Sequence, residues 1–277
     1  MAGQTRPVAH PSPYDDLARP PLRERALNRA LAGEAWRVEV VERAGSTNAL
    51  VAERARAGEP AGLVVVAEEQ TAGRGRLDRS WVSPPRAGLT LSVLVRPELP
   101  PARWPWLPLV TGLAVATALR ERAELDAQLK WPNDVLVDGR KVCGVLAEVP
   151  VTGAAVLGIG LNVTTRAGEL PHDGATSLRL AGASTTDRAT VLRAVLRSLA
   201  HVLEDVEAAR EQYRVRCSTL GVEVRVELPG GATVMGVAEA VDDDGRLVVD
   251  GTAYGAGDVV HLRPAGGDGA AAPGAPD

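Results

Sequence analysis

The chain has 277 residues, with 31 Lys and Arg against 35 Asp and Glu and a formal net charge of -4. This balance excludes the broad positive field that non-specific binding to nucleic acids or anionic membranes requires. No apolar run reaches the length of a membrane span, and the N-terminus lacks the apolar core of a secretory signal. We therefore expect a cytoplasmic protein that binds neither nucleic acid nor membrane.

Two residue types are scarce enough to be informative. Cys143 and Cys217 are too few for a disulfide framework and fit no pattern of zinc ligands, so we expect reduced thiols and no metal site. Only two lysines occur, Lys130 and Lys141, and the other 29 of the 31 basic residues are arginine. The two lysines are therefore the first candidates for a specific chemical role.

Apolar periodicity and turn residues divide the chain into both helices and strands. Residues 1–21 are rich in proline without apolar periodicity and predict a disordered lead, and residues 265–277 predict a disordered tail. The elements expected between them, in chain order, are a helix over 22–32, a strand over 36–43, a helix over 46–57, strands over 63–67 and 89–97, a helix from Pro105 to about Arg122, a hairpin turning at Asp138-Gly139, a strand over 154–163 and one long amphipathic helix over 187–212.

The pattern changes after Tyr213. From 221 to 263 the sequence consists of short β-branched runs separated by glycine-containing turns, which predicts five short strands and a small β-barrel. The sequence thus predicts an α+β protein. Its main domain spans 22–218 and holds a mixed β-sheet with helices, and the small all-β module spans 219–264.

Residues 70–81, QTAGRGRLDRSW, form the first candidate binding loop. Two glycines let the backbone approach a ligand closely, and three arginines bring fixed positive charges. These residues are Gly73, Gly75, Arg74, Arg76 and Arg79. Such a loop suits a phosphate or a carboxylate, whereas the alternatives are a solvated arginine-rich loop or an RGG-like contact to nucleic acid. The loop lacks both the Walker A pattern and the third glycine of a dinucleotide-binding GxGxxG.

The second candidate is the segment KWPND at 130–134, together with Lys141 after the predicted Asp-Gly turn. We expect the hairpin to fold the strands of the two lysines back on each other, so that both ammonium groups serve one site. Lysine is a compact point charge, suited to an α-phosphate or to a carboxylate undergoing activation. Asn133 and Asp134 can hold a base, a metal-bound phosphate or an incoming amine. The alternative is that Trp131 packs in the core while Asp134 caps a turn.

Two further motifs lie at the ends of predicted strands. Ser46, Thr47 and Asn48 follow Gly45 where a strand gives way to a helix, so their side chains can bind a polar heterocycle or an anion. The alternative is a simple N-cap. The segment GIGLN at 158–162 combines glycines that allow close backbone approach with an asparagine at the strand end, a weak signal on its own.

Taken in order, these motifs resemble those of biotin protein ligases. The resemblance covers residues from about 36 to 263, and its combination of GRGRxxRxW with KWPND and GRK is highly specific. It implies the class II synthetase-like catalytic fold of biotin and lipoate ligases, followed by an SH3-like β-barrel. The matching segments are GSTN at 45–48, QTAGRGRLDRSW at 70–81, KWPND at 130–134, GRKVCGVLAE at 139–148 and GIGLN at 158–162.

The resemblance also implies roles for individual residues. Biotin-binding residues would be Ser46, Thr47, Asn48, Gln70, Gly73, Arg74, Gly75, Arg76 and Lys141. Residues at the ATP and adenylate would be Arg74, Arg76, Arg79, Trp81, Lys130, Asn133 and Asn162. Catalytic roles would fall to Lys141, Arg76, Lys130 and Asp134. Lys141 would meet the biotin carboxylate and the α-phosphate, and Asp134 would orient either the acceptor lysine or a magnesium-bound phosphate.

The implied reaction has two steps. The biotin carboxylate attacks the α-phosphorus of ATP, which gives biotinyl-5′-adenylate and pyrophosphate. A lysine amine on a biotin carboxyl carrier domain then attacks the acyl carbon and releases AMP. Biotin and ATP are therefore substrates, Mg²⁺ enters with the ATP, and no tightly bound prosthetic group is expected.

Many members of this family carry an N-terminal winged-helix domain that binds an operator, and the proline-rich start of this chain does not fit one. We therefore expect the monofunctional type. The alternatives are a lipoate–protein ligase, an enzyme that adenylates another acid, and a nucleic-acid-binding module built on the GRGR loop. The last is disfavoured by the net charge and by the lack of an aromatic-rich strand.

Overall fold

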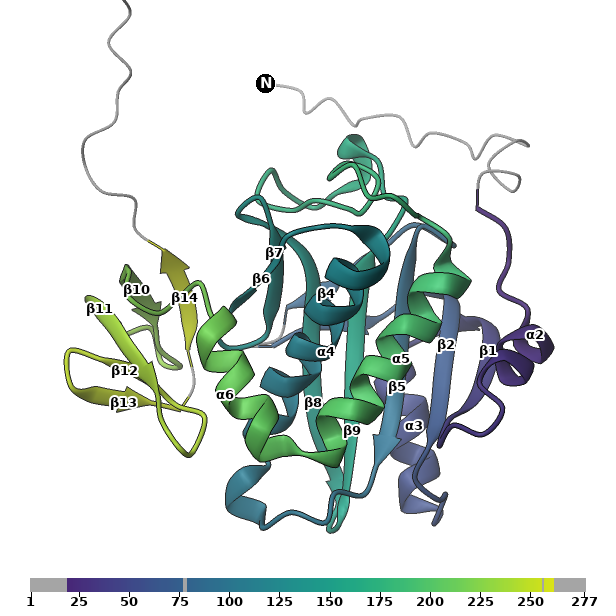
Figure 1. Cartoon of the computed structure of the whole chain (residues 1–277), viewed down its shortest axis with the longest axis horizontal. Coiled ribbons are helices and arrows are strands. Elements are labelled where there is room, and N and C mark those ends of the chain that lie inside the picture. The colour runs from purple at the N-terminus through teal and green to yellow at the C-terminus, as the bar shows by residue number, and fades with distance from the viewer. Residues whose placement is uncertain (1–18, 77–78, 256, 262–277) are drawn as a thin grey trace, which may run out of the picture.

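The computed structural model describes residues 19–76, 79–255 and 257–261 (Figure 1). The tail expected over 265–277 lies outside these residues, as does the expected lead up to residue 18. Residues 19–21 differ from the expected disorder. Arg19 is buried and pairs with Glu169 at 2.5 Å, and the Pro20 carbonyl accepts a hydrogen bond of 2.7 Å from Arg188.

A seven-stranded mixed sheet forms the main domain, in the order β1-β2-β5-β9-β8-β7-β6. Strands β1 and β2 are parallel, and every other neighbouring pair is antiparallel. A separate two-stranded ribbon pairs β3 (Gly73–Arg74) with β4 (Ser80–Trp81). The strands of the large sheet are β1 (Arg37–Ala44), β2 (Leu63–Gln70), β5 (Gly88–Val95), β6 (Ala127–Lys130), β7 (Asp134–Val137), β8 (Arg140–Val151) and β9 (Ala154–Asn162).

Helices cover both faces of this sheet (Figure 1). On one face α4 (Trp106–Ala123) packs against α5 (Arg188–Glu204) and α6 (Val206–Arg216), and this face holds most of the hydrophobic core. On the other face α3 (Thr47–Arg56) covers β2, β5 and β9 with a smaller apolar cluster. The short α2 (Glu24–Ala30) packs beside β1. Among the described residues, no helix has the length and apolarity needed to cross a membrane.

The single helix predicted over 187–212 is wrong, because the chain forms two helices, α5 and α6, with a break at Asp205. The Asp205 side chain caps α6 by accepting a hydrogen bond of 2.9 Å from the Ala208 amide. Apolar residues keep helical spacing across the break, with Val202 and Val206 both buried. The apolar pattern therefore continues from α5 into α6, and only the capping residue Asp205 marks the break between the two helices.

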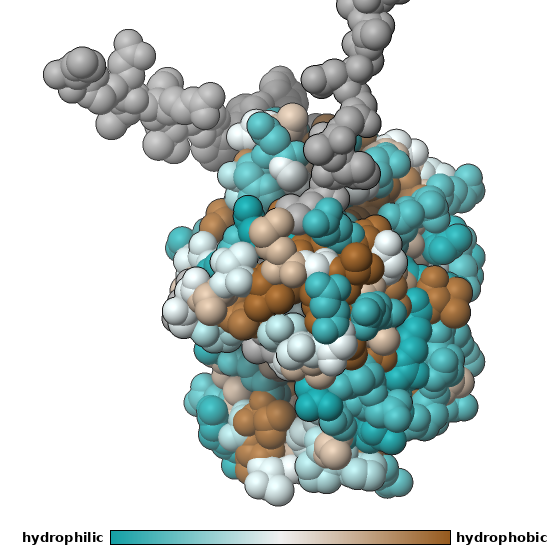
Figure 2. Space-filling view, turned by 90° about the vertical axis from the view of Figure 1, so that its left-hand side faces the viewer, coloured by the Kyte–Doolittle hydropathy of each residue, from teal (hydrophilic) through white to brown (hydrophobic). Residues whose placement is uncertain are grey.

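Five short strands form the second unit, as predicted, in the order β13-β12-β11-β10-β14. Figure 2 views the molecule from the side of this module and shows apolar residues scattered among hydrophilic ones on that surface. Among the exposed apolar side chains of the module are Met235, Val237 and Val260. The strands are β10 (Glu223–Glu227), β11 (Thr233–Val241), β12 (Leu247–Val249), β13 (Thr252–Tyr254) and β14 (Asp258–His261).

The turn between β11 and β12 packs against the main domain and holds the module there through hydrogen bonds and an ion pair. The indole nitrogens of Trp106 and Trp131 donate to the carbonyls of Asp243 and Gly245, at 2.9 and 3.0 Å. The buried Arg210 guanidinium pairs with the Asp243 carboxylate at 2.6 Å. Trp131 is thus a core residue, as the alternative reading of KWPND held, and it also anchors the module.

Candidate active site

The floor of the candidate site follows from the alternation of residues along β9. In a strand, successive side chains point to opposite faces of the sheet. Leu157 and Leu161 therefore belong to the helix-covered core, whereas Gly158, Gly160 and Asn162 face the side that carries α3. The sequence GIGLN thus gives one face of the strand an apolar surface and the other almost no side chains.

Neighbouring strands extend this arrangement through their register. Gly160 lies between Thr90 of β5 and Gly144 of β8. In the next row along the sheet, Gly158 lies between Ser92 and Leu146 in the same way. Above these rows is a cavity of about 630 Å³, a size typical of small-molecule sites.

The two glycines of β9 are required because other side chains occupy the space above them. A Cβ atom on Gly160 would lie 2.4 Å from the indole ring of Trp81. On Gly158 it would lie 2.2 Å from Oδ1 of Asn48. The backbone of β9 therefore serves directly as the floor, with Trp81 over one part and Asn48 over the other.

One end of the cavity is lined by neutral polar groups at the start of α3. Ser46 caps this helix, and its Oγ accepts a hydrogen bond of 3.4 Å from the Ala49 amide. The Thr47 amide donates to Oε1 of Gln70 at 2.9 Å. Asn48 is almost fully buried, and its Oδ1 accepts from Oγ of Ser92 at 2.5 Å. Ser46 therefore caps α3 and also lines the cavity, together with Thr47 and Asn48.

The other end is positively charged. The Lys141 ammonium pairs with the Asp134 carboxylate at 2.6 Å and lies 5.9 Å from the centre of the Trp81 ring. Arg76 donates to Oδ1 of Asn133 at 3.5 Å and to the Gly257 carbonyl of the β-module at 3.3 Å. The cavity is therefore electrostatically asymmetric. At one end, amides and hydroxyls accompany an ion pair between Arg74 and Glu148 whose charges balance, whereas at the other end the cations outnumber the carboxylate of Asp134.

Burial and like charges shift the pKa values of the cations at this end. Burial lowers the pKa of Arg76, and the Asp134 carboxylate opposes this while Arg79 adds to it. Burial also lowers the pKa of Lys130, again against the attraction of Asp134 and with the repulsion of Lys141 and Arg79. A cluster of partly desolvated cations of this kind favours an anionic ligand.

The expected direct pairing of the two lysine-bearing strands is wrong. Lys130 lies on β6 and Lys141 on β8, and β7 runs between them. The Asp-Gly turn is the predicted one, with φ of 50° at Asp138 and 69° at Gly139, but it joins β7 to β8. Lys130 therefore lies opposite Asp134 in the register of β6 and β7, and Asp134 forms its ion pair with Lys141.

A β-bulge sets the direction of Lys141. The register between β7 and β8 shifts so that Val135 faces Cys143 while Leu136 faces Lys141, and Val142 is the extra residue. Val142 and Cys143 are both buried, and Lys141 comes to line the same cavity as Gly144 despite the odd spacing. The bulge is what places the ammonium group in the site.

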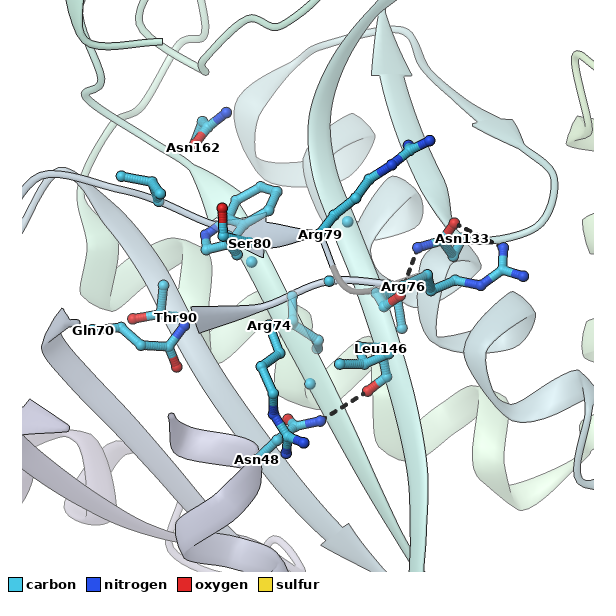
Figure 3. A pocket seen from close by; sticks show the side chains of 18 of the residues that line it. Asn48, Gln70, Arg74, Arg76, Arg79, Ser80, Thr90, Asn133, Leu146 and Asn162 are labelled. Atoms are coloured by element: carbon cyan, nitrogen blue, oxygen red, sulfur yellow. Dashed lines mark hydrogen bonds between the residues drawn. The ribbon is translucent and has the colours of Figure 1, made fainter. Parts of the chain in front are cut away.

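The predicted arginine loop lies over the cavity as the β3–β4 ribbon (Figure 3). Figure 3 shows the Arg74 side chain pointing toward Asn48, whereas Arg76 points toward Asn133. Arg74 is half exposed and pairs with Glu148 at 3.1 Å. The Trp81 indole nitrogen is buried and has no hydrogen-bond partner within the described ranges.

Most residues predicted for the site lie together in this one cavity. Gly73 and Lys130 are not among its lining residues, although Gly73 contacts Gln70 and Lys130 lies beside Asp134. The predicted residues that do line it are Ser46, Thr47, Asn48, Gln70, Arg74, Gly75, Arg76, Arg79, Trp81, Asn133, Asp134, Lys141 and Asn162.

Sequence reasoning did not assign several residues at the cavity. Thr90, Leu146 and His172 line it, and Ser92 and Glu148 hold its polar end through hydrogen bonds. The alternation of β8 could have indicated Leu146 and Glu148, because both lie an even number of residues from Gly144. No spacing or motif points to His172, which follows the site strands in a loop.

The two cysteines were expected to be reduced thiols. Cys143 and Cys217 are buried free thiols, and burial raises the pKa of both. Neither thiol lines the cavity, which suits a packing role for Cys143 in the core. Across the residues that the structure describes, no three His, Cys, Asp or Glu side chains gather as metal ligands.

The fold and the cavity define a ligase of the biotin and lipoate type. Residues 40–163 match the Biotin/lipoate A/B protein ligase family, and residues 219–262 match the Biotin protein ligase C terminal domain. The chain is 45% identical over 264 residues to the biotin–[acetyl-CoA-carboxylase] ligase of Mycobacterium tuberculosis, covering 90% of this chain and 98% of that protein. It belongs to the biotin protein ligase family.

Solved structures agree with this assignment. The biotin protein ligase from Aquifex aeolicus in complex with biotin and ATP superposes with a TM-score of 0.69 at 31% identity, over 82% of this chain and 98% of that one. The ligase from Leishmania major in complex with biotinyl-5-AMP superposes with a TM-score of 0.60 at 28% identity, over 82% and 98% of the two chains. The expected α+β fold with a C-terminal β-module is therefore confirmed.

Proposed function

We propose that the chain forms biotinyl-5′-adenylate from biotin and ATP and transfers the biotinyl group to a lysine of a biotin carboxyl carrier domain. It is a biotin–[carboxyl-carrier] ligase, and its acceptor is of the acetyl-CoA carboxylase type. The observation that carries the proposal is the asymmetry of the cavity. A neutral polar end faces a cationic end, which fits a ligand with a hydrogen-bonding ring and a carboxylate tail.

The neutral end is assigned to the biotin ring. Thr47, Asn48 and Gln70 present amide and hydroxyl groups that can pair with a ring urea, and Ser46 fixes the start of α3. The glycine floor admits a flat ring system because no Cβ atom projects from it. Arg74 on the ribbon above then closes over the bound ring, together with the backbone of Gly73 and Gly75.

The cationic end is assigned to activation of the carboxylate. Lys141 leaves Asp134 to contact both the biotin carboxylate and the α-phosphate, because a ligand with two anionic groups offers more negative charge than one carboxylate. Arg76 and Lys130 add positive charge where it develops on the transferring group. No covalent protein nucleophile is required, since the reaction depends on positioning and charge stabilisation.

The nucleotide is assigned to the part of the cavity around Trp81 and Lys141. Arg79, Trp81, Asn133 and Asn162 supply a cation, an aromatic ring and two amides there. Mg²⁺ enters with the phosphates of ATP, which suits a site that has single carboxylates and no protein cage of three or more acidic ligands within the described ranges. Asp134, released by Lys141, is placed to orient the magnesium-bound phosphate or the acceptor amine.

We assign the enzyme to the cytoplasm. The two buried thiols and the use of ATP fit a cytoplasmic enzyme. Residues 19–36 hold one short helix, α2.

The direct test is to incubate the protein with biotin, ATP, Mg²⁺ and a purified carrier domain and to analyse the carrier by mass spectrometry. We expect the mass of one biotin on one lysine, together with pyrophosphate release that requires biotin. Lipoate in place of biotin should give no modified carrier, because its dithiolane ring offers no partner to Asn48 and Gln70. Equal use of lipoate would identify a lipoate–protein ligase, and pyrophosphate release without carrier modification would identify another adenylating enzyme.

A further inference from the structure

Glu148 is an acidic residue at the neutral end of the cavity that the proposed chemistry leaves without a role. It lies on β8, two residues beyond Leu146 and therefore on the same face of the sheet as the cavity floor. One carboxylate oxygen, Oε2, accepts hydrogen bonds from Nδ2 of Asn48 at 2.6 Å and from Nη2 of Arg74 at 3.1 Å. Glu148 thus joins the first turn of α3 to the ribbon above the cavity.

The contacts of Asn48 show what the carboxylate controls. Its Nδ2 donates to Glu148 and, at 3.3 Å, to the Leu146 carbonyl, while its Oδ1 accepts from Ser92. Turning the amide over would place Oδ1 against the negative carboxylate, which is electrostatically unfavourable. The charge of Glu148 therefore determines which end of the Asn48 amide faces Ser92 and the floor.

The contact with Arg74 has a different consequence. The Arg74 and Glu148 side chains are 49% and 31% exposed, so their ion pair contributes little to the stability of the fold. It does fix one position of the ribbon, because Glu148 lies on a strand within the sheet while Arg74 lies on the two-stranded ribbon. Figure 3 shows the same arrangement, with Arg74 extended toward Asn48 and away from Arg76.

These contacts belong to a continuous polar chain. Arg74 donates to Glu148, which also accepts from Asn48, and Asn48 in turn accepts from Ser92. Ser92 lies 2.8 Å from Oγ1 of Thr47, whose amide and hydroxyl both reach Oε1 of Gln70. Gln70 packs against Gly73 of the ribbon, so the chain of contacts returns to its starting strand.

We propose that Glu148 is a positioning residue that orients the Asn48 amide and latches the β3–β4 ribbon over the biotin ring, and so determines how long biotin and its adenylate stay bound. The identity of the ligand rests on the proposed function, whereas the latch itself is a property of the ligand-free protein. Glu148 touches no reacting atom in this proposal. It acts through Asn48 and Arg74.

The test compares Glu148→Gln, which keeps the shape and removes the charge, with Glu53→Gln at an exposed position of α3 outside the cavity. We expect Glu148→Gln to raise the KM for biotin and the dissociation rate of biotinyl-adenylate roughly tenfold, with the KM for ATP and the melting temperature unchanged. Glu53→Gln should match the wild type in all four. A fall in melting temperature with parallel rises in both KM values would show a merely structural role and overturn the proposal.

A double-mutant cycle with Arg74→Ala tests the latch directly. If Glu148 acts on the ribbon through Arg74, the double variant should release the adenylate no faster than roughly twice the rate of the faster single variant. Rates that multiply, giving about a hundredfold increase, would mean that the two residues act independently and would overturn the latch.

Hydrogen exchange of the ligand-free protein separates this proposal from the proposed function. Peptides covering the β3–β4 ribbon should exchange roughly fivefold faster in Glu148→Gln than in the wild type, while peptides of β9 stay unchanged. Unchanged exchange in the ribbon would overturn the latch whether or not the protein acts on biotin. A wild type that forms no biotinyl-adenylate would refute the function, and the latch would then be judged on exchange alone.

Discussion

The two faces of the central sheet are built from the same strands but have different functions, since one stabilises the fold and the other lines the cavity. One face presents leucine and valine side chains to α4 and α5 and excludes water, whereas the other presents glycines, hydroxyls and amides beneath the cavity and a smaller apolar cluster beneath α3. In β9 adjacent residues illustrate both, since Leu157 is core and Gly158 is floor. Stability and ligand binding are therefore assigned to alternate residues, and a substitution should affect one property without the other.

The largest effect should follow removal of the Lys141 ammonium from the polar face. We expect Lys141→Ala to slow adenylate formation about a hundred- to a thousandfold, because a preorganised positive charge at the reacting group is lost. The melting temperature should stay near that of the wild type, since the Lys141 side chain is partly exposed. Biotin-dependent pyrophosphate release measures the effect, and a wild-type rate would refute the assignment of this end of the cavity.

A substitution on the core face should do the reverse. Leu157→Ala removes a fully buried side chain, so the free energy of unfolding should fall by about 2–5 kcal/mol. Urea denaturation followed by circular dichroism measures this loss. At low temperature, where the variant remains folded, the KM values for biotin and ATP should equal those of the wild type. A raised KM would mean that the two faces are coupled through the backbone.

Gly160→Ala tests the floor itself. The added methyl group would collide with the Trp81 ring, so the ring must move, and we expect the KM for ATP to rise about tenfold or more. Gly168→Ala is the matched control, because a Cβ atom at that position meets nothing within 4 Å. Its kinetic constants should be unchanged. Equal effects of the two alanines would show that the floor does not depend on close approach.

The smallest effect concerns the titration of Lys130. Because burial lowers its pKa, its ammonium is lost at a lower pH than that of an ordinary lysine, and activity that needs this charge falls as pH rises through the lowered value. Arginine does not titrate in this range, so Lys130→Arg should extend the alkaline limb of the pH–rate profile to higher pH. Identical alkaline limbs would mean that Lys130 does not govern the profile.

The sequence predicted the local features of this fold well, where short-range chemistry determines them. The turn at Asp138 and Gly139 has the positive φ angles that its residues favour, and Ser46 caps α3. The break at Asp205 was missed because burial continues across it with helical spacing. Local patterns thus identified most elements but not every change of direction.

The site was predicted as a set of motifs but not as a geometry. The bulge that turns Lys141 into the cavity depends on how β8 pairs with β7, and pairing is not encoded in the spacing of 130–141. The contact of Glu148 with Arg74 joins residues 74 positions apart, for which no local signal exists. Motifs therefore supplied the members of the site, and the register of the sheet supplied their positions.

The turn between β11 and β12 has a further consequence for the molecule as a whole. Trp106 and Trp131 belong to the core of the main domain, yet their indole nitrogens donate to the carbonyls of Asp243 and Gly245 of the module. Detaching the module would leave two buried donors unpaired and uncover the rings beneath it. We therefore expect the main domain and the module to unfold together, in a single cooperative transition.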